Sequence, residues 1–219
     1  SGQLVFRDGA TMASSDYVSI TLSGIGGHGA MPQLTADPIV AASSIIMALQ
    51  TVVSRNIDPM QAAVVTVGAI HAGVANNVIP QTAQLELSVR ALDRGVRARL
   101  EQRIKALVQA QAESYGVKAE VNWKPGYAVL VNTAAETEFA RKVGVELMGE
   151  SGIIRNGPAL TGSEDFAFML EKLPGSYLFI GNGAGEGSCM VHNPSYDFDD
   201  SNIPIGASYW ACLAETYLR

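Results

Sequence analysis

The sequence predicts an α/β chain whose first part, residues 17–124, is a ferredoxin-like unit. Four segments there are β-branched or alternate apolar and polar side chains, as half-buried strands do, and two segments repeat apolar residues at helical spacing. Their order along the chain is β-α-β-β-α-β, the split β-α-β pattern. Residues 125–219 then indicate part of a second, layered α/β unit, and residues 1–16 indicate a connector.

The first strand and helix of the ferredoxin-like unit flank a glycine-rich loop. Residues 17–22 (YVSITL) alternate as a strand, and the loop SGIGGHGAMP follows them. Asp37 and Pro38 predict a helix start, because Asp is a good N-cap and Pro suits the first helical position. Apolar residues keep helical spacing to about Val53, which predicts the length of this helix.

Two further strands, a second helix and a last strand complete this unit. Asp93 is the expected N-cap of the second helix, and Gly116 is expected to end it. The predicted bounds are 62–70 and 83–92 for the strands, 93–115 for the helix and 117–123 for the last strand.

The second part of the chain is predicted to contain three helices but only one strongly buried strand. The composition shifts at Lys-Pro-Gly 124–126, and the apolar run SYLFIG at 176–181 is typical of a strand covered on both faces. Few other strand candidates follow residue 125, so we expect its partner strands to come from elsewhere. The predicted helices are 133–148, 163–170 with Ser163 as its cap, and one from Pro204 to Tyr217, with 184–200 as a loop.

The composition limits the class of partner. Charged residues make up only 16% of the chain against about 25% in a typical soluble domain, which indicates either an apolar surface for a partner or an ordinary core rich in Ala and Val. The net charge of −6, without a basic cluster, argues against nucleic acid, including an RNA-binding ferredoxin-like domain. The chain has two cysteines without metal or C-x-x-C spacing and no apolar run of about 20 residues. We therefore expect a reducing, cytoplasmic location and no membrane partner.

Two of the three histidines are candidates for chemistry. His28 lies between glycines, which allow a backbone to approach a ligand closely, although a histidine there also caps its own loop. His192 is followed by Asp197, Asp199 and Asp200, so it is a candidate metal ligand with carboxylates around it. One histidine does not make a site, because catalytic zinc needs three protein ligands. His71 lies beside a turn and is expected to be structural.

Asn77 and Arg90 form a second candidate set. An arginine together with an amide suits bidentate recognition of a carboxylate, whereas an edge-strand arginine in a surface ion pair is the alternative. Glu164, in TGSEDF, is ambiguous between a capping carboxylate and a functional one.

Six stretches together resemble one known family. They are MASSDYVSITLSGIGGHGAMPQLTADPIVAA, TVGAIHAGVANNVIP, LELSVRALDRGVR, TGSEDFAFM, PGSYLFIGNG and VHNPSYDFDD, with GGHGAMP followed by DPI and HNPSYDF the most specific. The chain is similar to the M20 metallopeptidase and amidohydrolase family, in particular its hippurate hydrolase and N-acyl-amino-acid amidohydrolase branch. The stretches span nearly the whole chain and occur in family order.

The resemblance implies a fold and a set of roles. The fold would be a zinc-exopeptidase-like α/β catalytic domain interrupted by a ferredoxin-like lid that also dimerises, with the lid at 17–124 and the C-terminal segment of the catalytic domain at 125–219. His28 would reach the active site of the neighbouring subunit and stabilise the oxyanion of the tetrahedral intermediate. The remaining implied roles are the substrate carboxylate for Asn77 and Arg90, the pocket lining for Ser163 and Glu164, and a metal ligand for His192.

The resemblance also implies parts that this sequence does not have. Family members have a Cys-Gly-His-Asp-Gly-His-type motif, a Glu-Glu pair and a further histidine ahead of the lid, which supply most ligands of a two-metal site and the general base. We therefore expect a divalent metal pair (Zn, Mn or Co) only in an intact enzyme that hydrolyses N-acyl amino acids such as hippurate. This chain alone is expected to bind no metal and to be inactive, and to pair with a second copy through the lid. The alternative is a non-catalytic module for dimerisation and substrate gating.

Overall fold

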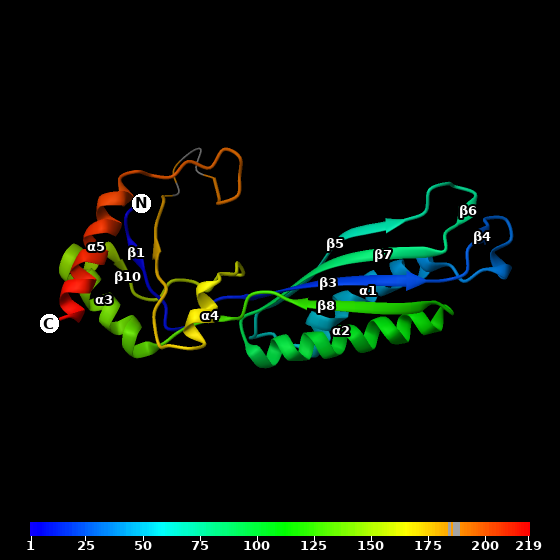
Figure 1. The fold of residues 1–219 in the computed structure, drawn as a ribbon, viewed down its shortest axis with the longest axis horizontal. Coiled ribbons are helices and arrows are strands. Elements are labelled where there is room, and N and C mark those ends of the chain that lie inside the picture. Colours follow the sequence, from blue (N-terminus) through cyan, green and yellow to red (C-terminus); the bar gives the residue numbers. More distant parts are fainter. Residues whose placement is uncertain (184, 186–188) are drawn as a thin grey trace. The chain divides into compact units, whose positions relative to one another are not determined.

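The computed structural model describes residues 1–183, 185 and 189–219, and it divides into two compact units (Figure 1). Four positions of the predicted loop 184–200, residues 184 and 186–188, lie outside the described residues. We call residues 12–130 together with 160–165 the lid unit. Residues 1–11, 131–159 and 166–219 form the other unit, which we call the terminal unit because it contains both chain ends.

The lid unit is an antiparallel four-stranded sheet in the order β5-β7-β3-β8. The helices α1 (Pro38–Asn56) and α2 (Arg94–Ser114) pack against it and against each other (Figure 1). This order is the ferredoxin-like arrangement, so the predicted fold class is confirmed. The strands are β3 (Ser14–Ser23), β5 (Ala63–Ala72), β7 (Thr82–Ala91) and β8 (Lys118–Pro125).

Sequence periodicity explains the core of the lid unit. Buried residues of α2 recur every four positions from Val96 to Ala112, and those of β7 alternate from Ala83 to Ala91. Both predicted N-caps are present: an Asp37 carboxylate oxygen accepts from the Ile39 amide at 2.8 Å, and Asp93 accepts from the Val96 amide at 2.9 Å. These caps start the helices where the sequence places them.

Helix α1 has the length and apolar composition of a membrane span. Its inner face, including Ala41, Ile45 and Leu49, is fully buried in the core of the lid unit. An apolar stripe that packs on a sheet accounts for this composition, as in the core helix of a globular domain.

A buried ion pair joins the lid sheet to α2. Asp16 of β3 has a side chain that is only 1% exposed, and both its carboxylate oxygens accept from Arg97, at 2.9 Å from Nε and 2.6 Å from Nη2. This bidentate geometry is the strongest form of a carboxylate–guanidinium contact.

The terminal unit contains a small sheet that the sequence did not predict. Strand β1 (Leu4–Val5) pairs in parallel with β10 (Ile153–Ile154) and antiparallel with β11 (Phe179–Ile180). The expectation that the strand at 176–181 has no partner in this chain is therefore wrong, although β11 remains an edge strand. Its neighbour comes from the predicted connector, where Leu4 and Phe6 are fully buried.

Helices and short elements complete the two units. In the terminal unit, the bounds of α3 (Ala134–Met148) and α5 (Asn202–Tyr217) differ by at most two residues from those of the predicted helices. The remaining elements are β2 (Gly9–Met12), β4 (Gly27–His28), β6 (Val78–Ile79), β9 (Leu130–Asn132), α4 (Phe166–Leu170) and the 3-10 turns Pro32–Leu34 and Glu150–Gly152.

Tyr209 of α5 makes the stability of the terminal unit depend on alkaline pH. Its ring is buried beside Phe6, its hydroxyl donates to the Ala140 carbonyl at 3.1 Å, and burial raises its pKa to about 12. The unfolded chain loses this proton near the usual pKa of about 10, so the contribution is present below pH 10 and is lost as the pH rises to 12. We expect the wild type to be more stable than Tyr209→Phe by about 1 kcal/mol at pH 8, and this difference to shrink above pH 10. Urea unfolding of the wild type and the variant, at pH 8 and at a pH above 10, measures this difference in stability. A difference that does not change with pH would contradict the raised pKa of Tyr209.

Candidate functional site

His28 and Asn77 lie together at one end of the lid unit. His28 pairs with Val78 across β4 and β6, and the Gly29 amide donates to the Asn77 carbonyl at 2.8 Å. A side chain at Gly29 would place its Cβ 3.1 Å from the Asn77 backbone, so this close approach needs a glycine. Both His28 and Asn77 are exposed. The loop therefore presents two polar side chains to a molecule outside the lid unit.

A backbone contact determines which nitrogen of His28 is a donor. The Ala30 amide donates to His28 Nδ1 at 3.0 Å, so Nδ1 is the acceptor of the neutral ring. The proton of the neutral ring is then on Nε2, and no hydrogen bond of this nitrogen is found among the described residues. A histidine in this tautomer donates a hydrogen bond to an oxygen that develops negative charge. The loop-capping contact therefore uses Nδ1 and leaves Nε2 as the donor of the ring.

Arg90 lies at the opposite end of the same sheet. It is paired with Ser15 of β3 and Val64 of β5, whereas Thr82, at the other end of β7, pairs with the last residue of β3. Eight strand steps separate Thr82 from Arg90, about 27 Å at the usual rise per residue. One copy of the chain therefore does not bring Arg90 together with Asn77, as a joint role in one site would require.

Arg90 is instead close to the loop that contains Ser163 and Glu164. Its Nη1 donates to the Thr161 carbonyl at 2.9 Å. Ser163 and Glu164 are both half-buried, and a Glu164 carboxylate oxygen accepts from the Asp165 amide. The predicted helix start at Ser163 is wrong, because α4 begins at Phe166. Residues 160–165 are held by the lid unit in a non-helical conformation, so Ser163 is not a cap.

His192 lies in an exposed turn of the terminal unit. Its φ of 70° is the one positive value among the non-glycine residues that the structure describes. A positive φ is uncommon outside glycine, although histidine adopts it more often than most residues do, and the His192 side chain is exposed.

Asp199, one of the three aspartates that follow His192, is engaged in hydrogen bonds. Asp199 accepts hydrogen bonds from the hydroxyls of Ser1 and Ser201, which hold its pKa below the usual range. Among the described residues, no three His, Cys, Asp or Glu side chains are grouped as a metal site would need. The donor set therefore does not fit a complete metal centre, and His192 qualifies as a single ligand at most.

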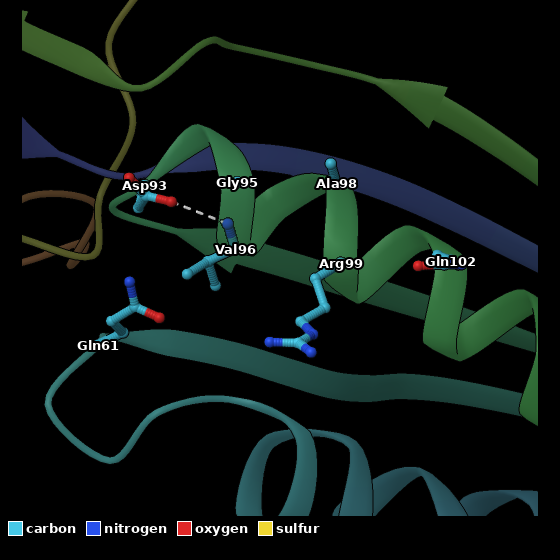
Figure 2. Close-up of a pocket in the computed structure, with 7 residues that line it drawn as sticks. All are labelled: Gln61, Asp93, Gly95, Val96, Ala98, Arg99 and Gln102. Atoms are coloured by element: carbon cyan, nitrogen blue, oxygen red, sulfur yellow. Dashed lines mark hydrogen bonds between the residues drawn. The ribbon is translucent and has the colours of Figure 1, made fainter.

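An open hollow of about 490 Å³ lies at the start of α2 (Figure 2). Asp93, Arg99 and Gln61 line it, but none of the predicted site residues does. The Asp93 carboxylate already occupies the helix N-terminus through the Val96 amide. This hollow therefore offers no support for a catalytic role.

The sequence analysis missed two contacts of the site because both use backbone atoms. Nothing in the residue types at Ala30 and Thr161 indicates that the first donates to His28 or that the second accepts from Arg90. The glycine at position 29 is the one available signal, since a tight approach between two loops favours glycine.

Comparisons with known proteins identify the family of the chain. Residues 11–216 match the model of peptidase family M20/M25/M40. The hippurate hydrolase of Campylobacter jejuni is 42% identical over 213 residues, 97% of this chain and 55% of that protein. The N-acetyl-L-cysteine deacetylase of Bacillus subtilis is 38% identical over 95% of this chain and 49% of that protein.

A solved structure has the same fold. The Bacillus subtilis protein described as a dinuclear metal-binding peptidase of family M20 superposes with a TM-score of 0.78 at 28% identity, over 97% of this chain and 52% of that one. This chain thus spans about half the length of the relatives it matches. The family match over residues 11–216, with these relatives, shows that the chain belongs to peptidase family M20/M25/M40, whose relatives named here include amidohydrolases.

Proposed function

We propose that this chain is part of an enzyme that hydrolyses the amide bond of N-acyl amino acids, with hippurate-like compounds as substrates. The names of the two curated relatives support an N-acyl amino acid as substrate. The observation that supports it best in the structure is His28, whose Nε2 is a free donor on an exposed loop. This donor would stabilise the oxyanion that forms when water attacks the amide carbon.

In this proposal, Arg90 binds the carboxylate of the substrate. Only one of its nitrogens has a hydrogen-bond partner in the described part of the chain, so the rest of the guanidinium is available. A guanidinium matches a carboxylate in a bidentate geometry. Ser163 and Glu164 would line the pocket beside it. Asn77 lies at the opposite end of the lid sheet, and it would add an amide contact to the carboxylate from a second copy of the chain.

The separation of Arg90 from His28 favours a site built from two copies of the chain. Each copy would supply Arg90, Ser163 and Glu164 to one site, and His28 with Asn77 to the site of the other copy. A two-fold dimer forms two such sites with the same contacts.

The two edges of the lid sheet differ in a way that supports pairing of two copies through β5. Edge strand β8 has Lys118, Glu120, Lys124 and Pro125, which discourage pairing with another chain. Edge strand β5 has ten residues, AVVTVGAIHA, without Asp, Glu, Lys, Arg or Pro. Met47, on the neighbouring helix α1, is 71% exposed. We therefore propose a homodimer through β5 and α1, and a strict monomer in sedimentation at micromolar concentration would contradict it.

Metal dependence is also part of the proposal. The B. subtilis structure described as dinuclear supports a metal pair in the intact enzyme, which supplies Lewis-acid chemistry when bound. Zn, Mn and Co are the proposed metals. His192 would be one ligand, and the others would come from outside the described residues. We also propose a cytoplasmic location, for which the low cysteine content, two in 219 residues, is the support.

The test compares this chain with the full gene product. Each is assayed with hippurate and Mn²⁺, Co²⁺ or Zn²⁺. We expect turnover by the full product only, and loss of at least tenfold in metal affinity in its His192→Ala variant, measured by calorimetry. Turnover by the 219-residue chain that His192→Ala abolishes would contradict the expected inactivity of the chain.

The alternative function is a non-catalytic module for dimerisation and substrate gating. The observation that favours it is the lack of a grouped metal-ligand set among the described residues. A full gene product that dimerises and binds hippurate but does not hydrolyse it with any of the three metals would support this alternative.

A further inference from the structure

We infer that Arg90 is also a positioning residue, which fixes the loop Leu160–Asp165 to the lid unit. The inference deepens the proposed function, because it assigns regulation of the pocket loop to the residue that would bind the carboxylate. The loop Leu160–Asp165 belongs to a different unit from the chain on either side of it. The chain before it, to Ala159, and after it, from Phe166, belongs to the terminal unit, whereas the loop itself belongs to the lid unit.

Backbone contacts attach this loop beside the start of β3. The Ala13 amide donates to two loop carbonyls, Leu160 at 3.0 Å and Gly162 at 2.9 Å, and Met12 forms a parallel bridge with Leu160. A Cβ at Gly162 would lie 3.2 Å from the Met12 side chain, so the loop packs tightly there. The loop is therefore attached to the lid unit through an isolated β-bridge and two backbone hydrogen bonds.

Among the described residues, Arg90 is the side chain of β7 that donates a hydrogen bond to the loop backbone. Its own backbone is fixed, because it lies between two strand partners, Ser15 and Val64. Its Nη1 donates to the Thr161 carbonyl, which lies between the two carbonyls that Ala13 binds. Three consecutive loop residues are thus held from two directions.

The same contact fixes the guanidinium. With Nη1 bound to Thr161, the planar group cannot rotate freely, and its remaining donors keep one direction. The loop orients Arg90 and Arg90 holds the loop. Ser163 and Glu164 follow directly after this anchored segment. A carboxylate that binds to Arg90 would therefore meet an ordered pocket loop, and loss of Arg90 would disorder the loop even when no carboxylate is present.

Amide hydrogen exchange of this chain tests the anchor without any activity. We expect the Ala13 amide, which donates to the loop, to exchange about tenfold faster in Arg90→Gln than in the wild type. Arg90→Lys is the second variant, and circular dichroism checks that both fold. The matched control is Arg103→Gln, since Arg103 also makes one side-chain hydrogen bond, at 2.9 Å to Asn56, but far from the loop in sequence and on another element. Exchange at Ala13 that is equal in the wild type and both folded Arg90 variants would overturn the inference.

A kinetic arm in the full gene product separates anchoring from carboxylate binding. Hippurate is compared with its amide, benzoylglycinamide, which has no carboxylate. If Arg90 only bound the carboxylate, wild type and Arg90→Gln would hydrolyse the amide equally, and that result would overturn the inference. We expect Arg90→Gln to remain about tenfold slower on the amide, with a lower kcat. Inactivity of the wild type on both substrates would contradict the proposed function, and the exchange experiment would then decide the anchor by itself.

Discussion

Replacement of Asp16 by alanine is expected to lower the free energy of unfolding by about 3–5 kcal/mol. The reason is the burial of the contact: the Asp16 carboxylate is 1% exposed and accepts two hydrogen bonds from Arg97, which is 24% exposed, so the variant removes both carboxylate acceptors from a partly buried guanidinium. Most of the loss in stability comes from the Arg97 guanidinium that loses this carboxylate, because removing one partner of a buried ion pair costs more than the intact pair contributes. Chemical denaturation followed by circular dichroism measures the change.

Two comparison variants make this prediction specific. Glu101→Ala removes the exposed ion pair with Lys105, four residues along the same helix, and is expected to cost less than about 1 kcal/mol. The double variant Asp16→Leu with Arg97→Met removes both charges and is expected to recover most of the lost stability. A double variant as unstable as Asp16→Ala would show that shape, and not the unpaired charge, determines the effect.

Replacement of His28 by alanine in the full gene product is expected to lower kcat by about 100- to 1000-fold. The Nε2 donor acts on charge that develops in the transition state, so KM should change little. Steady-state kinetics with hippurate measures both values. The control is Glu113→Ala, because Glu113 is an exposed residue of α2 in the same unit and has no proposed role. A higher KM with an unchanged kcat would contradict the assignment of His28 to the oxyanion.

The proposed exchange of residues between two copies gives a second readout for His28. A refolded mixture of His28→Ala and Arg90→Gln subunits should regain about a quarter of wild-type activity, because half of random dimers are mixed and each mixed dimer has one complete site. If both residues served a site within the same copy, no mixture would regain activity. The His28→Ala variant refolded alone provides the baseline activity.

The lid unit was predictable because its signals are local. Asp37 and Asp93 cap helices through amides two and three residues away, and the alternation along β7 buries one face of a sheet. These features need only a few neighbouring residues to be recognised. The strand order then follows from the β-α-β-β-α-β pattern.

The terminal unit was less predictable because its sheet joins distant segments. Val5 pairs with Phe179, and each strand of this sheet has only two residues, too few for any periodicity to show. The start at Ser163 failed for a related reason: the sequence around it resembles a helix cap, but contacts from Ala13 and Arg90 hold the preceding residues extended. Tertiary contacts overrode the local preference.

The candidate site was predictable in residue type but not in arrangement. The resemblance named His28, Asn77 and Arg90 together, yet the length of β7 places the first two far from the third. The distance follows from strand geometry once the bounds are known. The direction of the His28 donor depends on the Ala30 amide, which no sequence pattern indicates.

The return of residues 160–165 to the lid unit has a consequence for protein engineering. A chimera that exchanges only residues 12–130 between two relatives would combine a new β3 with a foreign segment opposite Ala13. The graft would then have mismatched packing at Gly162, where a Cβ would lie 3.2 Å from the Met12 side chain. A chimera that keeps its function has to exchange residues 160–165 together with residues 12–130, because these two segments form one structural unit that is discontinuous in sequence.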